Sequence, residues 1–353
     1  MQKIDNIEIK NFKSIRHQEI EGCKRINVFI GYPNVGKSNI LEALSIFAIL
    51  GNEFDLSNLI RFEKLTTFFY NGEISKKAEI VINKYNRYFI ELLGNFLRFT
   101  YEFDYAKLGF DLLDSNQGSS REKVSSFEIN ESSSKIFNFE ERKKHEKHLP
   151  EIKRYEFANK IQFETGQYLS LKYPYGNNIF DIISTNEKLL KEMTELFKSY
   201  QLELFYDSRS QEFQILKRIG VKGFTVPYNL VADTLKRLIF YKAAILSNKD
   251  SVLLFEEPES HMFPPYIAKF TTDIIFDENN NQYFITTHSP YVLNEFIEES
   301  QNELAIYLVD YDKGETVIKR LTDEQVNEVA QYGIDLFFNL ETYLDKYGQP
   351  HSA

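Results

Sequence analysis

The pattern of apolar and polar positions predicts buried strands that alternate with helices at both ends of the chain. Short alternating runs predict strands near residues 4–9 and 12–20. Continuous apolar runs, typical of strands covered on both faces, predict further strands at 25–30, 252–255, 283–287 and 304–309. Apolar residues that recur every three or four positions predict helices at 37–50, 230–246, 264–278, 322–331 and 334–347. This alternation predicts an α/β fold, with a mixed sheet and helices on both of its faces.

The middle of the chain follows a less regular pattern. Residues 55–225 combine β-rich runs, a helical pattern at 187–200 and polar stretches, which predicts an inserted α+β lobe. Within this lobe, residues 114–134 are rich in Ser, Asn, Gln and Glu, so they are expected to form a flexible loop. Residues 1–54 and 226–353 are then the two parts of one α/β domain.

Composition excludes several classes of protein. Hydrophobic residues make up 42% of the 353 residues and charged residues 27%, as in globular proteins. The apolar run 43–50 is far shorter than the about 20 residues of a membrane span, so no membrane contact is expected. Cys23 is the only cysteine, which excludes a disulfide framework and fits a cytoplasmic protein. The net charge of -10 means that the chain as a whole is not attracted to nucleic acid.

A turn bounded by glycines provides the most specific chemical signal. The segment 31–38 fits the pattern G-x-x-x-x-G-K-[ST] at every position and lies between a predicted strand and a predicted helix. Glycines let backbone N–H groups wrap phosphates, and the helix N-terminus adds partial positive charge at the same place. Lys37 is expected to reach the β- and γ-phosphates of ATP, and the Ser38 hydroxyl to bind Mg²⁺. The other residues predicted to bind the nucleotide are those of the same turn, Gly31, Pro33, Asn34, Val35, Gly36 and Asn39.

Two acidic residues and a histidine follow other predicted strands. Glu256 and Glu257 come directly after the apolar run 252–255, which is the form of a Walker B strand. Glu256, where Asp is usual, is expected to hold the metal, and Glu257 to orient and deprotonate the attacking water. His288 ends the run 283–287, and the C-terminal ends of parallel strands form the ligand edge of a sheet. His288 is therefore expected to contact the γ-phosphate, with a purely structural role as the alternative.

These segments together resemble a known family. The phosphate loop, Glu-Glu-Pro-Glu-Ser-His at 256–261 and Thr-Thr-His-Ser-Pro at 286–290 are similar to those of ABC-type AAA ATPases related to SMC and RecF proteins. The opening Asn-Phe-Lys-Ser at 11–14 is also similar to the start of that group. The likeness is closest to the ATPase domains of OLD-family and Septu-type anti-phage proteins.

The resemblance implies a P-loop NTPase with an SMC-head-like fold that binds ATP and pairs head-to-head with a second copy. It also places Lys13 near the nucleotide. Relatives offer a Leu-Ser-x-Gly-type signature from the partner subunit, and the best candidate here, residues 230–234, lacks both Ser and Gly. Asp233 in this segment either faces a phosphate or caps the following helix. The sequence does not locate the glutamine loop of the family.

The motifs predict an ATPase, and the resemblance implies that its ATP-dependent dimerisation controls a separately encoded nuclease or toxin in anti-phage defence. The chain after His288 is too short for the Toprim domain of OLD proteins, so no nuclease activity of its own is expected. The charge run 140–154 is predicted as a solvated helix, with contact to nucleic acid or to the effector as the alternative. A non-hydrolysing nucleotide sensor and a RecF-like DNA repair ATPase are the two other functions that the sequence leaves open.

Overall fold

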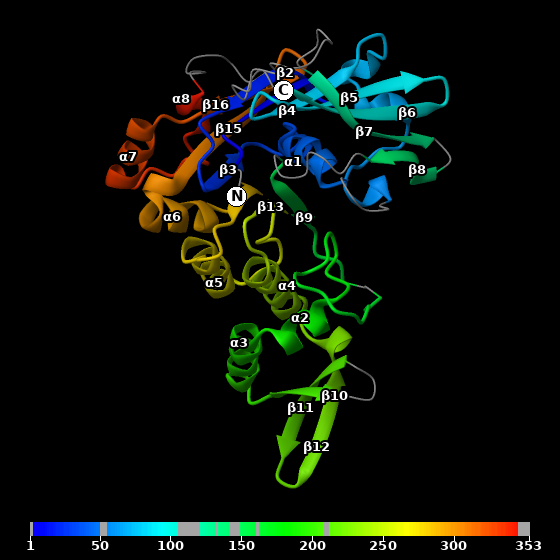
Figure 1. The fold of residues 1–353 in the computed structure, drawn as a ribbon. Helices are drawn as coiled ribbons and strands as arrows, with labels where there is room; N and C mark the ends of the chain where they lie inside the picture. Colours follow the sequence, from blue (N-terminus) through cyan, green and yellow to red (C-terminus); the bar gives the residue numbers. More distant parts are fainter. Residues whose placement is uncertain are drawn as a thin grey trace, which may run out of the picture.

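Both ends of the chain contribute strands to one six-stranded sheet at the centre of the molecule (Figure 1). The structure is a computed structural model that describes residues 3–49, 55–104, 121–130, 133–141, 149–159, 162–207 and 212–344. The strand order is β16-β15-β3-β14-β13-β9, in which all neighbours are parallel except β15 and β16. The strands are β3 (Ile26–Ile30), β9 (Glu151–Tyr155), β13 (Ser251–Glu256), β14 (Gln282–Thr286), β15 (Leu304–Asp312) and β16 (Glu315–Arg320).

The central strands are apolar because both faces of this sheet are covered. Every residue of β3 and β14 is buried, as is β13 up to Phe255. Successive residues of β13 point to opposite sides, so Leu254 joins one core cluster and Leu253 and Phe255 join the other. The strands predicted at 25–30, 252–255, 283–287 and 304–309 are all confirmed, and so is the α/β fold class.

A second sheet of seven antiparallel strands covers one face, with α1 (Lys37–Ser45) packed between the two sheets. Its order is β2-β1-β4-β5-β6-β7-β8. Buried and partly exposed residues alternate along β5 and β6, because one face meets the core and the other meets solvent. The strands are β1 (Asn6–Phe12), β2 (Ile15–Glu21), β4 (Ala78–Ile82), β5 (Asn86–Leu93), β6 (Phe96–Asp104), β7 (Arg121–Asn130) and β8 (Ser133–Glu141).

Helices cover the opposite face of the central sheet. They are α4 (Asp233–Ser247), α5 (Pro264–Ile275), α6 (Pro290–Glu299) and α7 (Asp323–Tyr332). The first residue of both α5 and α6 is a proline. Proline lacks an N–H group, and at this position an N–H group has no acceptor within the helix. A capping box of Thr322 and Gln325 begins α7, and Gly333 ends it with φ 61°. None of the helices in the described ranges is both long and apolar enough to cross a bilayer.

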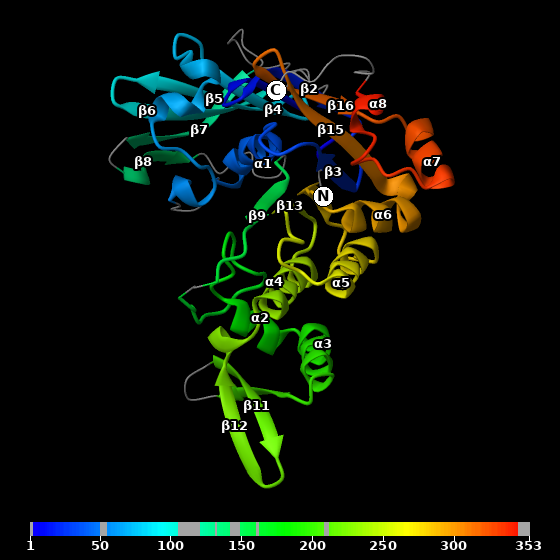
Figure 2. The ribbon, with the colours of Figure 1, turned by 180° about the vertical axis from the view of Figure 1, so that it is seen from behind.

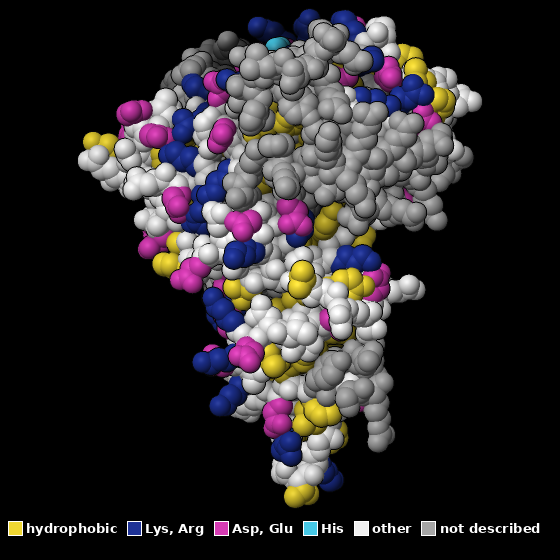
Figure 3. Space-filling view, in the orientation of Figure 1, with side chains coloured by type: hydrophobic (Ala, Val, Ile, Leu, Met, Phe, Trp, Pro, Cys, Tyr) yellow, Lys and Arg dark blue, Asp and Glu magenta, His cyan; other side chains and the backbone are white. Residues whose placement is uncertain are grey.

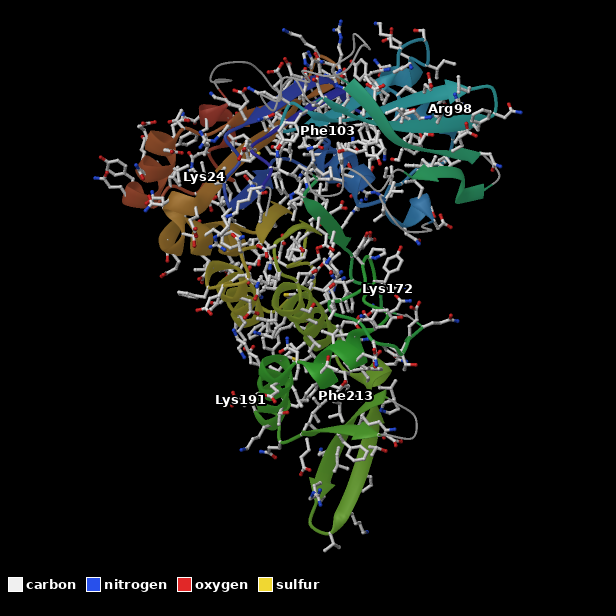
Figure 4. The ribbon with its side chains drawn as sticks, viewed as in Figure 1. Lys24, Arg98, Phe103, Lys172, Lys191 and Phe213 are labelled. Atoms are coloured by element: carbon white, nitrogen blue, oxygen red, sulfur yellow. The ribbon has the colours of Figure 1, made fainter. Side chains whose placement is uncertain are left out.

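A narrow arm projects from the helical face, as both ribbon views show (Figures 1 and 2). It consists of α2 (Ile179–Thr185), α3 (Glu187–Lys198), β10 (Glu203–Asp207), β11 (Glu212–Ile219) and β12 (Lys222–Pro227). Phe213 joins the small sheet to α2 (Figure 4), where its ring centre lies 5.6 Å from that of Phe180. Hydrophobic side chains are exposed at the tip of the arm (Figure 3), among them Val221 and Phe224.

The structure corrects the prediction of one inserted lobe over residues 55–225. Strands β4 to β8 extend the N-terminal hairpin into the seven-stranded sheet, and β9 is the edge strand of the central sheet beside β13. Among the described residues of this range, the arm is the part that projects as a separate unit (Figure 1). The β-rich pattern was visible in the sequence, but a strand's pattern does not state which strand it pairs with.

Three local predictions also need correction. Residues 121–130 of the predicted loop 114–134 form β7, whereas 114–120 and 131–132 lie outside the described residues. The described parts of the charge run 140–154 include the end of β8 and the strand β9 and are not helical, whereas 142–148 lie outside the described residues. The predicted helix 334–347 is reduced, within the described residues, to the short α8 (Leu340–Tyr343). The Asp335 side chain accepts the backbone N–H of Phe337 (2.8 Å), which favours a turn there.

Candidate functional site

The phosphate loop, the acidic pair and His288 meet at one edge of the central sheet. β3, β14 and β13 are neighbours and run parallel, with Phe29 paired to Thr286 and Thr286 to Glu256. Their C-terminal ends therefore lie side by side, and the residues that follow them face one cleft. This cleft has a volume of about 750 Å³, which is within the usual range for ligand sites.

The phosphate loop holds a conformation that only its glycines permit. Gly36 precedes α1 with φ 97°, and a Cβ there would lie 2.2 Å from Thr316 Oγ1. A Cβ on Gly31 would lie 2.0 Å from the Val309 carbonyl oxygen of β15. The loop is thus pressed against β15 and β16, with the N-terminus of α1 at its end.

Lys37 lies across this loop with its ammonium directed at backbone oxygens. Its Nζ donates to the carbonyls of Gly31 (3.0 Å) and Tyr32 (2.8 Å). Burial lowers the pKa of Lys37 to about 8, against the opposing effect of the Glu257 and Glu256 carboxylates. The ammonium is therefore positioned for phosphate groups, and its charge depends on pH close to the neutral range.

Glu256 is engaged on both carboxylate oxygens. Oε1 accepts from Ser38 Oγ and from Arg61 Nη2 (3.1 Å), and Oε2 pairs with Arg154 Nη2. Burial alone would raise the pKa of Glu256, but Arg154, Ser38 and Arg61 together hold it below its usual value. Glu256 is consequently ionised at neutral pH.

The donors at this point fit a divalent cation. The Ser38 hydroxyl and a carboxylate oxygen of Glu256 converge, and hard oxygen donors of this kind are what Mg²⁺ prefers. The longer side chain of Glu, compared with Asp, still brings the carboxylate to the serine. Ser38 and Glu256 are therefore the residues that would hold the ion beside the phosphates.

Glu257 and His288 form a second pair on the open side of the cleft. His288 Nε2 lies 3.2 Å from Glu257 Oε1, and the Glu257 side chain is 42% exposed. Burial and the charge of Lys37 lower the pKa of His288, against the opposing effect of Glu257. His288 is therefore neutral at pH 7 and lies close to the carboxylate, which accepts from the Ser260 hydroxyl at its other oxygen (3.4 Å).

Sequence reasoning missed Glu259, which fixes the position of His288. Glu259 is buried, and its Oε1 accepts from Thr287 Oγ1 (2.6 Å) and from the backbone N–H of His288 (3.0 Å). Burial raises the pKa of this carboxyl. The repeat of acids in Glu-Glu-Pro-Glu was visible in the sequence, but only the fold shows that the third acid reaches the next strand.

Most residues predicted for the site line the cleft. These are Lys13, Pro33, Asn34, Gly36, Lys37, Ser38, Asn39, Glu256, Glu257 and His288. Gly31 and Val35 are not among its lining residues. Val35 is buried in the core between the sheets, so its part in the loop is structural. Lys13 pairs with the buried Glu42 and donates to the Arg61 carbonyl (2.6 Å).

Other cleft residues had no signal in the sequence. Arg61, Glu156, Phe157, Arg237 and Tyr241 also line the cleft. Glu156 and Phe157 directly follow β9, so they reach the ligand edge only because β9 belongs to the central sheet. No sequence pattern assigned that strand to the sheet.

The segment expected to be the signature lies at the start of α4. Asp233 is the first residue of this helix, so the capping position is Ala232, and the prediction of Asp233 as the cap is wrong. The Asp233 side chain instead pairs with Lys236 (2.9 Å) and accepts from Asn159 (3.0 Å). Thr234 Oγ1 donates to the carbonyl of His261 (3.0 Å), which ties this helix to the segment after Glu257.

Comparisons with known proteins agree with this geometry. Residues 26–294 match the family described as "AAA domain, putative AbiEii toxin, Type IV TA system". Over 330 residues the chain is 22% identical to an ATP/GTP phosphatase of Helicobacter pylori, covering 84% of this chain and 86% of that protein. The DNA replication and repair protein RecF of a Thermoanaerobacter species is 31% identical over 108 residues, which are 28% of this chain and 29% of RecF.

A solved structure shows the same fold. It is the crystal structure of an Smc head bound to the C-winged helix domain of ScpA, with a TM-score of 0.51 and 13% identity. The similarity covers 93% of this chain and 100% of that chain. Because the family match spans most of the chain, including the phosphate loop, the acidic pair and His288, this protein belongs to that family of AAA-type ATPase domains and has the fold of an SMC head.

Proposed function

We propose that this protein binds ATP together with Mg²⁺, hydrolyses it to ADP and phosphate, and uses ATP-dependent pairing of two copies to control a separate effector protein. The observation that supports this most directly is the cleft itself, because Lys37, Ser38, Glu256, Glu257 and His288 all line it. These side chains come from three neighbouring strand ends, and their chemistry matches the needs of phosphoryl transfer.

In this proposal each side chain has a separate task. The backbone of the phosphate loop and the Lys37 ammonium bind the phosphates. Ser38 and Glu256 would hold a divalent cation, which would supply charge that offsets the phosphate oxygens. The Glu257 carboxylate accepts a proton from water as the water oxygen bonds to the γ-phosphorus and the bond to ADP breaks. Neutral His288 lies against Glu257, the Ser260 hydroxyl donates to Glu257, and Glu259 holds the backbone of His288.

The surface around the cleft supports pairing with a second copy. Leu230 before α4 and Phe263 before α5 are 74% and 62% exposed, and Tyr32 of the phosphate loop is 47% exposed. Exposed apolar side chains beside a charged cleft are typical of a surface that a partner covers. The family description names a Type IV toxin–antitoxin system. The separately encoded effector and its part in anti-phage defence are proposed from the resemblance of the motifs to anti-phage ATPases.

A phosphate-release assay tests this function. Lys37→Ala is expected to lower ATP turnover by at least about 100-fold, because it removes the ammonium from the phosphate site. The matched control is Lys191→Ala, since Lys191 is exposed on α3 of the arm (Figure 4) and its removal should leave turnover unchanged. Turnover that is equal in the wild type and Lys37→Ala would remove the assignment.

Nucleotide affinity is expected to fall as the pH rises through about 8. Below this pH, Lys37 already holds its proton in the free protein. A bound triphosphate raises the pKa of Lys37, because the anion favours the ammonium form. Above pH 8 the triphosphate must therefore bind together with a proton. The dissociation constant of a non-hydrolysable ATP analogue should then rise by up to about tenfold per pH unit. Lys37→Arg keeps its charge and should give a flatter profile. A pH-independent wild-type affinity would contradict the prediction.

A non-hydrolysing nucleotide sensor is the second candidate. Two observations favour it: both oxygens of Glu256 already contact arginines, and Asp233 stands in the signature-like segment. Tight ATP binding without phosphate release would support the sensor over the ATPase. A RecF-like DNA repair role has less support, because positive and negative side chains are mixed on the described surface visible in Figure 3.

A further inference from the structure

A network of charged side chains lines the cleft and ends on the carboxylate of Glu256. The buried Glu42 pairs with Lys13 and accepts from Arg61 Nε (2.8 Å). Arg61 also donates to one oxygen of Glu256, and Arg154 pairs with the other. Arg154 Nη2 also lies 3.9 Å from the carboxylate of Glu156, whose side chain is 52% exposed. Three cations thus face three carboxylates, of which Glu42 and Glu256 are the ones largely shielded from water.

The two arginines on Glu256 are in different environments. The Arg154 side chain on β9 is 2% exposed, whereas that of Arg61 is 63% exposed. Arg154 is also anchored through Nη1, which donates to the carbonyl of Leu59. Charges interact more strongly where water is excluded, so Arg154 dominates the electrostatics of Glu256 and Arg61 contributes less.

This arrangement changes what the carboxylate offers to a cation. A carboxylate that is already paired with a buried guanidinium has part of its charge compensated, so a divalent cation gains less from it. A triphosphate, in contrast, meets a carboxylate whose repulsion is already partly compensated. Nucleotide binding should therefore depend less on the cation than it would if the Glu256 carboxylate had no buried partner. The nucleotide could then bind first and the cation second.

We propose that Arg154 is a positioning residue for Glu256 and supplies, from inside the protein, part of the positive charge that a divalent cation would bring. It holds the carboxylate against Ser38, and it allows the nucleotide to bind before the metal. This inference rests on the proposed function, because it requires a nucleotide at the phosphate loop. Arg154 acts through Glu256 and is not itself placed in contact with the nucleotide.

The test is the metal dependence of nucleotide binding at equilibrium. The dissociation constant of a fluorescent ADP is measured with excess EDTA and with excess Mg²⁺, and the ratio of the two values is compared among variants. The wild-type ratio is expected to stay within about tenfold. In Arg154→Met, Glu256 loses its buried cation and repels the phosphates unless metal is present, so the ratio should rise by at least roughly a further tenfold.

Two further variants separate charge from structure. Arg61→Met removes the exposed arginine from the same carboxylate and should raise the ratio much less, because water already screens that pair. Arg154→Lys keeps the charge and should stay near the wild-type ratio, and thermal unfolding of each variant confirms that it is folded. Should Arg154→Met not fold, the wild-type ratio and the Arg154→Lys ratio decide the question.

The outcomes distinguish this inference from the function on which it rests. Equal ratios in the wild type and Arg154→Met, an Arg154→Lys ratio as high as that of Arg154→Met, or a wild-type ratio above about a hundredfold would each overturn the role of Arg154. If the wild type binds no nucleotide even with Mg²⁺, it is the proposed function that fails.

Discussion

Replacement of Glu257 by Gln is expected to stop ATP turnover while ATP still binds. Gln has the same shape, but its amide cannot accept the proton of the attacking water, and loss of a general base typically lowers a rate by about 10²–10⁴. The Lys37, Ser38 and Glu256 contacts remain, and one negative charge near the γ-phosphate is removed, so affinity should not fall. Phosphate release and the dissociation constant for ATP, measured on the same preparation, check both halves of the prediction.

The same variant should accumulate as a dimer. Slow hydrolysis prolongs the ATP-bound state, so sedimentation velocity is expected to show dimers with ATP and monomers with ADP. Glu278→Gln is the matched control, because Glu278 is exposed and precedes β14, at the opposite end of that strand from His288. Wild-type turnover in Glu257→Gln would exclude Glu257 as the base, and a monomer with ATP would exclude pairing driven by ATP.

Gly36→Ala is expected to disable the phosphate loop. The new Cβ would lie 2.2 Å from Thr316 Oγ1 and 2.6 Å from Ser14 Oγ, at a residue whose φ is 97°. Neither neighbour can move freely, because Ser14 and Thr316 hydrogen-bond each other (2.6 Å) and Thr316 also donates to the Val35 carbonyl (2.8 Å). Backbone strain and overpacking together should lower the free energy of unfolding by about 2–5 kcal/mol.

A second glycine separates these two causes. Gly94, between β5 and β6, also has a positive φ of 61°, but no atom lies within 4 Å of the site of its Cβ. Gly94→Ala should therefore lower the free energy of unfolding by only about 1–2 kcal/mol and leave nucleotide binding unchanged. Denaturant unfolding and nucleotide binding are measured for both variants. Equal losses in the two would show that the contacts with Ser14 and Thr316 do not matter.

Local patterns were sufficient to locate the reactive segments. The glycines of the phosphate loop, the apolar run before Glu256 and the run before His288 each lie within a few neighbouring residues. Their element types follow from short-range rules, since a continuous apolar run bounded by turn residues is typical of a buried strand. Parallel neighbours then place strand ends at one edge, which is why the acidic pair and the loop could be expected to meet.

The role of β9 could not be predicted in the same way. Its residues 151–155 follow a run of mixed charges, which was interpreted as a solvated helix. Only the pairing of β9 with β13 makes Arg154 a neighbour of Glu256 and brings Glu156 and Phe157 to the cleft. An arginine in a charged stretch has no local feature that indicates burial, since burial depends on what packs against it.

The sequence by itself determined the chemistry of this protein: a phosphate loop with Lys37 and Ser38, an acidic pair, and a histidine at the end of a buried strand. Tertiary structure alone decided the strand order, the joining of β4 to β8 with the N-terminal hairpin, and the contact of Arg154 and Arg61 with Glu256. The physical reason is the distance along the chain over which each kind of interaction acts. Turn chemistry and apolar periodicity act between close neighbours in the chain, whereas strand pairing and the pairing of buried charges depend on residues that only folding brings together.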